Sequence, residues 1–132
     1  MNNSAHKYKF LFKKKTNKHR NRKVIYDGHK FDSLKEKERY IQLQLLLKAG
    51  EIRGFRHHVI FELIPKNKHF RAVNYESDFV VWDKYGNQIV EDCKAKVTNW
   101  HKKNYHYSGL TKDYIIKKKL MFHIHNILIK EI

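Results

Sequence analysis

The sequence predicts an α/β domain whose elements follow the order helix, three strands, helix and strand. Three observations predict this order. A leucine-rich segment with helical spacing covers residues 34–47, and runs of strand-forming residues follow between 52 and 95. A second helical pattern begins at Thr111, and a segment of alternating apolar and polar residues covers 126–132. A chain of 132 residues has room for one domain. We therefore expect helices packed against one central sheet.

Residues 1–23 read as a basic arm, and 24–132 as the folded domain. The arm carries nine Lys or Arg and no acid, and such a block repels itself unless a phosphate backbone neutralises it. Its apolar residues leave open that it docks on the domain instead, and a transit peptide is the other alternative. We expect the arm to bind nucleic acid through Lys13, Lys14, Lys15, Arg20 and Arg22.

A hairpin and a helix open the domain. Lys23 to Phe31 should form the hairpin around an Asp27-Gly28 turn. The helix should be capped by Asp32 or Ser33, with Gly50 as a left-handed stop. Glu36 fits a capping box in this frame. The wide apolar surface that should lie against the sheet comprises Leu34, Tyr40, Ile41, Leu43, Leu45, Leu46 and Leu47.

Three strands and a loop should follow. The first covers Ile52 to Ile64 and ends at Pro65, and the second covers Phe70 to Trp82 after a Lys66-Asn67-Lys68 turn. The third begins after a Lys-Tyr-Gly-Asn turn and closes near Ala95. Beyond it lies a basic and aromatic loop that suits stacking on bases and neutralising phosphates, with a solvated loop as the alternative. Its candidate contacts are Lys96, Trp100, Lys102 and Lys103.

The second helix should begin at Thr111 with Asp113 in its first turn. Its apolar side includes Tyr114 and Met121. Three consecutive lysines span most of a turn, so at least one must face inward or toward a ligand. These lysines, which we expect to bind nucleic acid, are Lys117, Lys118 and Lys119.

Carboxylates stand in otherwise apolar strands. Asp78 precedes Val80-Val81-Trp82, and Glu91-Asp92 follows Ile89-Val90. A carboxylate near a core costs several kcal/mol unless it is paired or binds a cation. The period of two puts Asp92 and Lys94 on one face, where a hairpin can bring Asp78 beside them. Glu91 faces the other way, as a supporting residue or the partner of a basic group.

Composition points to a polyanion as the partner. A formal charge of +16 and a pI near 9.9 favour nucleic acid, with an AT-rich genome as the plain alternative explanation. Cys93 is the one cysteine, so no intramolecular disulfide can form and a reducing compartment is indicated. No apolar run approaches the roughly 20 residues of a membrane span. We expect a cytoplasmic or virion-associated protein. The ten histidines lack the spacing of a zinc site.

The acid pattern resembles that of the PD-(D/E)XK nuclease superfamily. Asp78 stands at the aspartate position, Asp92 at the second acid and Lys94 at the lysine, while Ser77 replaces the proline. Over about residues 24–131, the blocks FDSLKEKERY, YESDFVVWD, VEDCKA and TKDYIIKKKLMF resemble a phage protein family catalogued as a domain of unknown function and grouped with these nucleases. The layout is similar to phage endonuclease I and other Holliday-junction resolvases.

This resemblance implies an αβββαβ restriction-endonuclease-like core with a mixed central sheet. It implies a Mg²⁺-dependent DNA endonuclease in which Mn²⁺ can substitute for Mg²⁺. The implied enzyme is a homodimer, and its DNA substrate can be branched. The implied catalytic residues are Glu36, Asp78, Asp92 and Lys94. Asp78, Asp92, Glu36 and the Cys93 carbonyl would hold the metal, and Lys94 would hold or polarise the attacking water. Glu91 and Glu38 would be supporting residues, and Glu38 competes with Glu36 by register.

Two other functions stay open. The first is a non-catalytic nucleic-acid-binding protein that retains the nuclease fold. The second is a structural or inhibitory protein that uses its charge on other partners.

Overall fold

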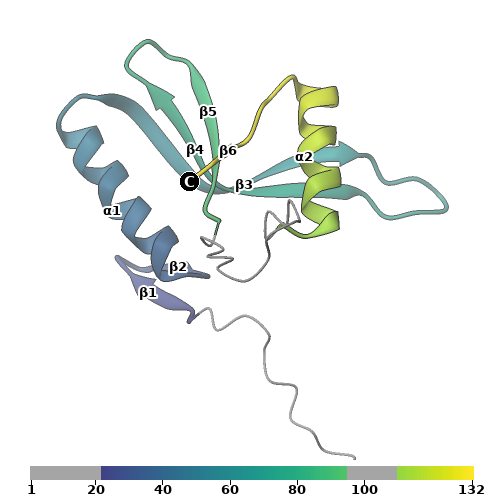
Figure 1. The fold of residues 1–132 in the computed structure, drawn as a ribbon, viewed down its shortest axis with the longest axis horizontal. Coiled ribbons are helices and arrows are strands. Elements are labelled where there is room, and N and C mark those ends of the chain that lie inside the picture. The colour runs from purple at the N-terminus through teal and green to yellow at the C-terminus, as the bar shows by residue number, and fades with distance from the viewer. Residues whose placement is uncertain (1–21, 95–109) are drawn as a thin grey trace, which may run out of the picture. The chain divides into compact units, whose positions relative to one another are not determined.

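The computed structural model describes residues 22–94 and 110–132 (Figure 1). The chain divides into two compact units, one ending at Leu34 and the other spanning Lys35–Ile132. The predicted boundary after residue 23 stays a prediction. No helix in the described residues is long and apolar enough to cross a membrane.

The first unit contains the predicted hairpin. Strand β1 (Val24–Tyr26) pairs antiparallel with β2 (His29–Phe31). Asp27 and Gly28 join the strands with φ angles of 51° and 73°. Two consecutive positive φ angles define the turn that best matches the twist of a two-residue hairpin, which is why Asp-Gly predicted it correctly.

The second unit has the predicted αβββαβ order. Its four-stranded sheet has the strand order β3-β4-β5-β6; neighbours are antiparallel except β5 and β6, which are parallel. The predicted mixed central sheet is therefore confirmed. The elements are α1 (Leu34–Lys48), β3 (Ile52–Ile64), β4 (Val73–Asp83), β5 (Gln88–Asp92), α2 (Lys112–His125) and β6 (Lys130–Glu131).

Helix α1 ends at the predicted glycine. Gly50 has a φ of 73°, and its N–H donates to the Leu47 carbonyl while that of Glu51 donates to the Leu46 carbonyl. This pair of bonds is the Schellman motif, which satisfies the last carbonyls of a helix. The helix packs on the sheet as expected, but it buries a narrower stripe than predicted. Leu45 stays 60% exposed, because only residues at helical spacing with Tyr40 and Leu43 face the strands.

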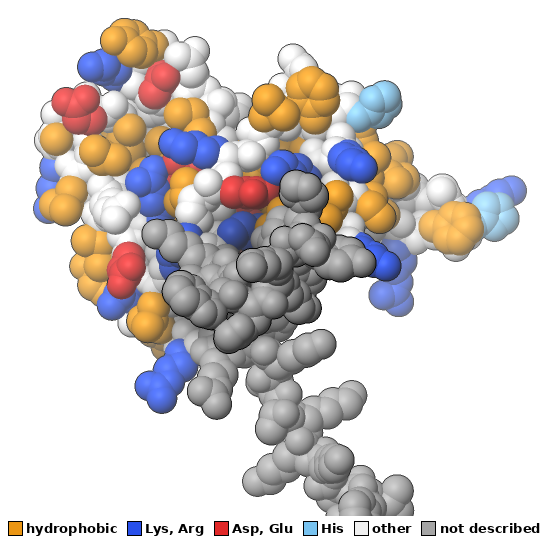
Figure 2. Space-filling model, in the orientation of Figure 1, with side chains coloured by type: hydrophobic (Ala, Val, Ile, Leu, Met, Phe, Trp, Pro, Cys, Tyr) orange, Lys and Arg blue, Asp and Glu red, His pale blue; other side chains and the backbone are white. Residues whose placement is uncertain are grey.

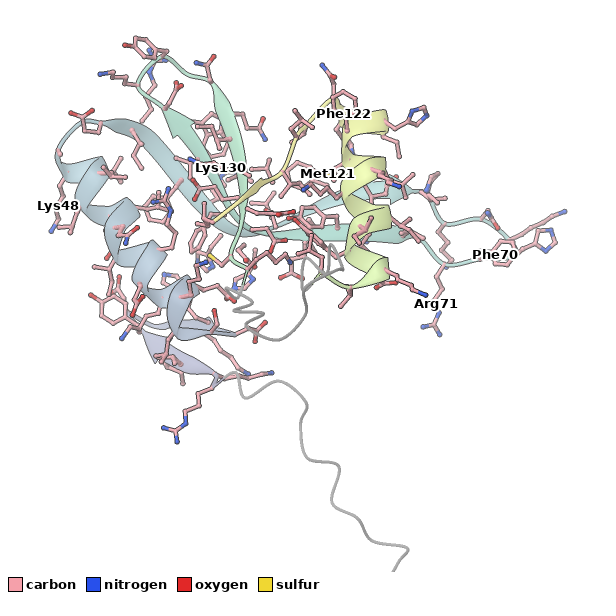
Figure 3. All side chains as sticks on the ribbon, viewed as in Figure 1. Lys48, Phe70, Arg71, Met121, Phe122 and Lys130 are labelled. Atoms are coloured by element: carbon pink, nitrogen blue, oxygen red, sulfur yellow. The ribbon has the colours of Figure 1, made fainter. Side chains whose placement is uncertain are left out.

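Helix α2 lies against β3 and β4 (Figure 1). Thr111 caps it by accepting the Tyr114 N–H at 3.2 Å, as predicted, and Asn126 ends it with a φ of 55°. Met121 is fully buried and points to the sheet (Figure 3). The core cluster around it comprises Leu63, Tyr75, Val80, Val90, Tyr114 and Ile129.

Three strand boundaries differ from the prediction. Strand β4 begins at Val73 rather than Phe70, because the Asn67 side chain accepts the N–H groups of His69 and Phe70 and holds them in a turn. The last strand covers only Lys130–Glu131, since the left-handed Asn126 first has to close α2. The third strand ends at Asp92, and Ala95, its predicted end, lies outside the described residues.

Strands β3 and β4 twist sharply near their middle. Tyr75 and Val80 are five residues apart on β4 and would face opposite sides of a flat strand, yet both belong to the same core cluster. His58 lies between the paired residues His57 and Val59 of β3 and has a positive φ of 53°, a conformation that few non-glycine residues adopt. Asp78 lies between Tyr75 and Val80, in the part of β4 where the side chains that face the core cluster change from one side of the strand to the other.

Candidate functional site

A surface groove gathers the predicted acid pair and lysine. Asp78 comes from β4, Asp92 is the last residue of β5, and Lys94 follows two residues later. The register that pairs Phe79 with Glu91 continues so as to bring Asp78 beside Asp92. The groove has a volume of about 290 Å³ and is lined by Tyr75, Glu76, Asp78, Asp92, Lys94, Thr111, Asp113, Tyr114 and Lys117.

Asp92 is held on both of its oxygens. Its Oδ2 accepts a 2.8 Å hydrogen bond from the Tyr75 hydroxyl, and its Oδ1 lies 2.7 Å from Lys94 Nζ. The Asp92 side chain is only 7% exposed, whereas that of Lys94 is 31% exposed. The carboxylate is therefore fixed from within the core, and the ammonium reaches it from the solvent side.

The Lys94 ammonium lies 3.6 Å from the centre of the Tyr114 ring. A cation over an aromatic face is attracted by the ring electrons. The Tyr114 hydroxyl in turn donates to Glu131 Oε1 at 3.1 Å. Burial, with the charge of Asp92 next, raises the pKa of both Tyr75 and Tyr114 above the ordinary tyrosine value. Both hydroxyls consequently remain hydrogen-bond donors over the physiological pH range.

The surroundings of Asp78 disfavour its negatively charged form. Burial, followed by the nearby charge of Asp92, raises the pKa of Asp78 to about 7. A 2.6 Å hydrogen bond from the Cys93 backbone N–H to Asp78 Oδ2 opposes this rise, as does the charge of Lys94. Two close carboxylates that resist joint ionisation are a common feature of functional sites.

Glu36, rather than Glu38, lies near the acid pair. Glu36 is 7% exposed on α1, and its charge contributes to raising the pKa of Asp78 and that of the Cys93 thiol. Burial is the larger cause for both groups. Glu38 is exposed and lines a separate surface pocket with Lys35. The geometry thus distinguishes two helix acids that the sequence left in competition.

Glu91 faces the other side of β5, as predicted. It is 1% exposed and forms a two-pronged ion pair with Arg39 of α1, with Oε1 2.7 Å from the Arg39 Nη2 and Oε2 2.8 Å from Nε. Bidentate pairs of this kind are geometrically specific. Glu91 therefore fastens α1 to the sheet, and through the helix it supports the position of Glu36.

Three supporting residues escaped the sequence analysis. Tyr75 and Tyr114 hold Asp92 and Lys94, and Lys35 donates from α1 to the backbone oxygens of Lys94 and Ile132. The sequence places Tyr114 only on an apolar surface and indicates no role for Tyr75, although a buried tyrosine usually needs a hydroxyl partner. No sequence signal points to Lys35, because its acceptors are backbone atoms brought close by β5 and β6.

The predicted nucleic-acid-binding residues are only partly described. Lys117 lines the groove, Lys118 pairs with Glu131 at 2.5 Å, and Lys119 is exposed. The three lysines thus have three different surroundings. Arg22 is exposed in the first unit. The rest lie outside the described residues: Lys13, Lys14, Lys15, Arg20, Lys96, Trp100, Lys102 and Lys103.

No group of three or more His, Cys, Asp or Glu side chains within 22–94 and 110–132 has an arrangement that could hold a metal ion. The groove nevertheless offers carboxylate oxygens, which are the donors that Mg²⁺ prefers. His125, the last residue of α2, contacts the Glu62 carbonyl through Nε2 at 2.8 Å.

Fold and site together define an α/β protein with one buried carboxylate, one half-buried carboxylate and a lysine in one open groove. The chain belongs to the family described as protein of unknown function (DUF1064), which matches residues 16–125. No curated protein and no solved structure matches the chain. The predicted membership in a family of unknown function is confirmed, and the relation to nucleases stays a prediction.

Proposed function

We propose that this protein is a metal-dependent DNA endonuclease that hydrolyses phosphodiester bonds. One observation carries the proposal. Asp78, Asp92 and Lys94 converge in one groove with an opening to solvent, in the positions that the resemblance to PD-(D/E)XK nucleases assigns to them. Ion pairs scattered over separate surfaces would have offered no such support.

The acid pair fits a hard divalent cation. At neutral pH Asp78 is poised between its two protonation states because burial and Asp92 oppose its ionisation, and a nearby positive charge would favour the carboxylate. Asp78 and Asp92 would hold Mg²⁺, with Glu36 and the Cys93 carbonyl as the further oxygen donors. Bound there, Mg²⁺ would offset charge on the phosphate and lower the pKa of water.

The protein's own groups would then orient the reactants. The Tyr75 hydroxyl keeps Asp92 in one orientation through its 2.8 Å bond. Lys94, bound to Asp92 on one side and to the Tyr114 ring on the other, would hold the attacking water or a phosphate oxygen. Preorganised charges of this kind are effective because they need no rearrangement during the reaction.

The charge of +16 supports DNA as the substrate. The likeness to junction resolvases supports a branched substrate and a homodimer. The single cysteine supports a cytoplasmic site of action, which would be the host cytoplasm for a phage-encoded protein. Lys117 lines the groove, and its ammonium group would bind a DNA phosphate.

The test is a cleavage panel. Four-way, nicked, single-stranded and linear DNA are incubated with the full chain in Mg²⁺, in Mn²⁺ and in EDTA. We expect cleavage only with metal, and a loss of at least about a hundredfold for Asp78→Asn and for Lys94→Met. Glu36→Gln should impair cleavage, and Glu38→Gln on the same helix is its matched control. Cleavage that survives Asp78→Asn would refute the proposal.

A non-catalytic nucleic-acid-binding protein is the second candidate. It is favoured by the ion pair that already joins Lys94 to Asp92 at 2.7 Å. This candidate predicts DNA binding that falls steeply with salt, no cleavage under any metal condition, and no effect of Asp78→Asn.

A further inference from the structure

The connection between β3 and β4 carries an exposed aromatic ring. Residues 65–72 form the end of this long hairpin, and Figure 3 shows Phe70 at its tip with Arg71 beside it. The Phe70 side chain is 74% exposed. Its one ring contact within the described residues is with neighbouring His69, at 6.2 Å between centroids. Phe70 thus contributes nothing to the core described above.

The tip is held in shape by its own hydrogen bonds. Asn67 Oδ1 accepts the backbone N–H groups of His69 at 2.8 Å and Phe70 at 2.9 Å, and the Asn67 N–H donates to the Phe70 carbonyl at 3.0 Å. A ring presented on a fixed turn loses less conformational freedom on binding than one on a flexible chain.

The tip is also strongly basic. Between Glu62 and Glu76 the chain has no acid. Its basic side chains are exposed and form no ion pair within the part of the chain that the structure describes. Figure 2 shows basic and histidine side chains around a hydrophobic one at this end. They are Lys66, Lys68, His69 and Arg71.

The next hairpin provides a contrast. Tyr85, in the turn between β4 and β5, is 76% exposed. However, the Lys84 ammonium lies 5.5 Å from its ring centre and also pairs with Glu51, and Asp83 is in the same turn. Both turns therefore expose an aromatic ring. Only the charged side chains around Phe70 are all basic, whereas those around Tyr85 include acids.

We propose that Phe70 stacks on an unpaired base of a DNA strand whose phosphates are bound by the basic residues of the tip. Aromatic rings amid positive charge are the usual means of binding unpaired strands. The inference rests on the proposed function for the identity of DNA as the partner. Phe70 precedes Asp78 by eight residues, so their Cα atoms lie at most about 26 Å apart along the strand. That span corresponds to about eight base steps of a B-form duplex and to fewer steps of an extended unpaired strand.

The test measures DNA affinity by fluorescence anisotropy in EDTA, so that no strand is cut. Single-stranded DNA, a four-way junction with unpaired bases at its centre, and fully paired duplex are the probes. Phe70→Ala should weaken binding of a probe with unpaired bases about 5- to 150-fold and leave duplex affinity nearly unchanged. Phe70→Tyr should retain the affinity. Whether Phe70→Ala loses affinity for the single strand or for the junction shows which of the two presents the unpaired base that Phe70 contacts.

Two controls separate the possible failures. Tyr85→Ala removes an equally exposed ring and should have no effect, and Lys68→Ala should lower the salt slope by about one on every probe. The inference would be overturned if Phe70→Ala and Tyr85→Ala bound unpaired DNA with equal affinity, or if Phe70→Ala lost as much affinity for duplex as for unpaired DNA. Either result would leave the proposed function standing. Wild-type protein that binds none of the probes would overturn the proposed function as well. Far-UV circular dichroism checks that each variant is folded.

Discussion

Raising the pH should weaken the metal-free fold, because Asp78 becomes a buried charge. Its pKa rises from the ordinary 3.8 to about 7 through burial and the Asp92 charge. A carboxyl with a raised pKa stabilises the folded state while it is protonated, and this stabilisation is lost as the pH climbs from about 4 to about 7. At 1.36 kcal/mol per pKa unit, the full window corresponds to about 4 kcal/mol and the interval from pH 5 to pH 8 to about 3 kcal/mol.

Asp78→Asn isolates this effect. Asparagine has nearly the same size and can still accept the Cys93 N–H, but it cannot ionise. Urea unfolding in EDTA should therefore show wild-type protein losing about 2–3 kcal/mol relative to the variant between pH 5 and pH 8. At pH 8 the variant should be the more stable protein, although it should not cleave DNA.

The control for this comparison is Asp83→Asn. Hydrogen bonds from the Asn87 side chain and turn amides lower the pKa of Asp83, so its replacement should bring no gain in stability at pH 8. Mg²⁺ at a hundred times its Kd should add about 2.7 kcal/mol to wild type and far less to Asp78→Asn. Parallel pH profiles for wild type and Asp78→Asn would refute the reasoning.

Other predictions concern the support of the site and the arm. Arg39→Ala should cost about 3–5 kcal/mol in urea unfolding because it leaves Glu91 charged and buried, and a cost below about 1 kcal/mol would contradict this. Tyr75→Phe should cost about 1.5–3 kcal/mol by removing a donor to buried Asp92, and it should slow cleavage more than it weakens DNA binding. Deleting residues 1–23 should lower DNA affinity and its salt slope in titrations while leaving the rate at saturating DNA unchanged; loss of the folded state would instead make the arm structural.

The order of the elements was readable because local signals mark their ends. Gly50 stops α1 through a left-handed conformation, Pro65 follows the last residue of β3, and Thr111 caps α2. Each signal acts on its immediate neighbours, so no tertiary information is needed. The start of β4 was misplaced because the Asn67 side chain captures Phe70 in a turn, and a β-prone residue beside a turn can join either structure.

The alternation of β5 correctly assigned Glu91 and Asp92 to opposite faces, since the period of a strand is a local property. The choice between Glu36 and Glu38 required the packing of α1, because two residues separated by two positions on a helix differ in direction by more than half a turn. The partners of Glu91 and Asp92 also depended on packing.

The sequence by itself determined the hairpin, the αβββαβ order, and the acids and lysine that would form a site. Only the tertiary structure decided that Asp78, Asp92 and Lys94 share one open groove, that Tyr75 and Tyr114 hold them, and that burial raises the pKa of Asp78. The physical reason is range. Hydrogen bonding within turns and helix ends acts over a few residues, whereas desolvation and the meeting of charges from β4, β5 and α1 exist only after those elements have packed.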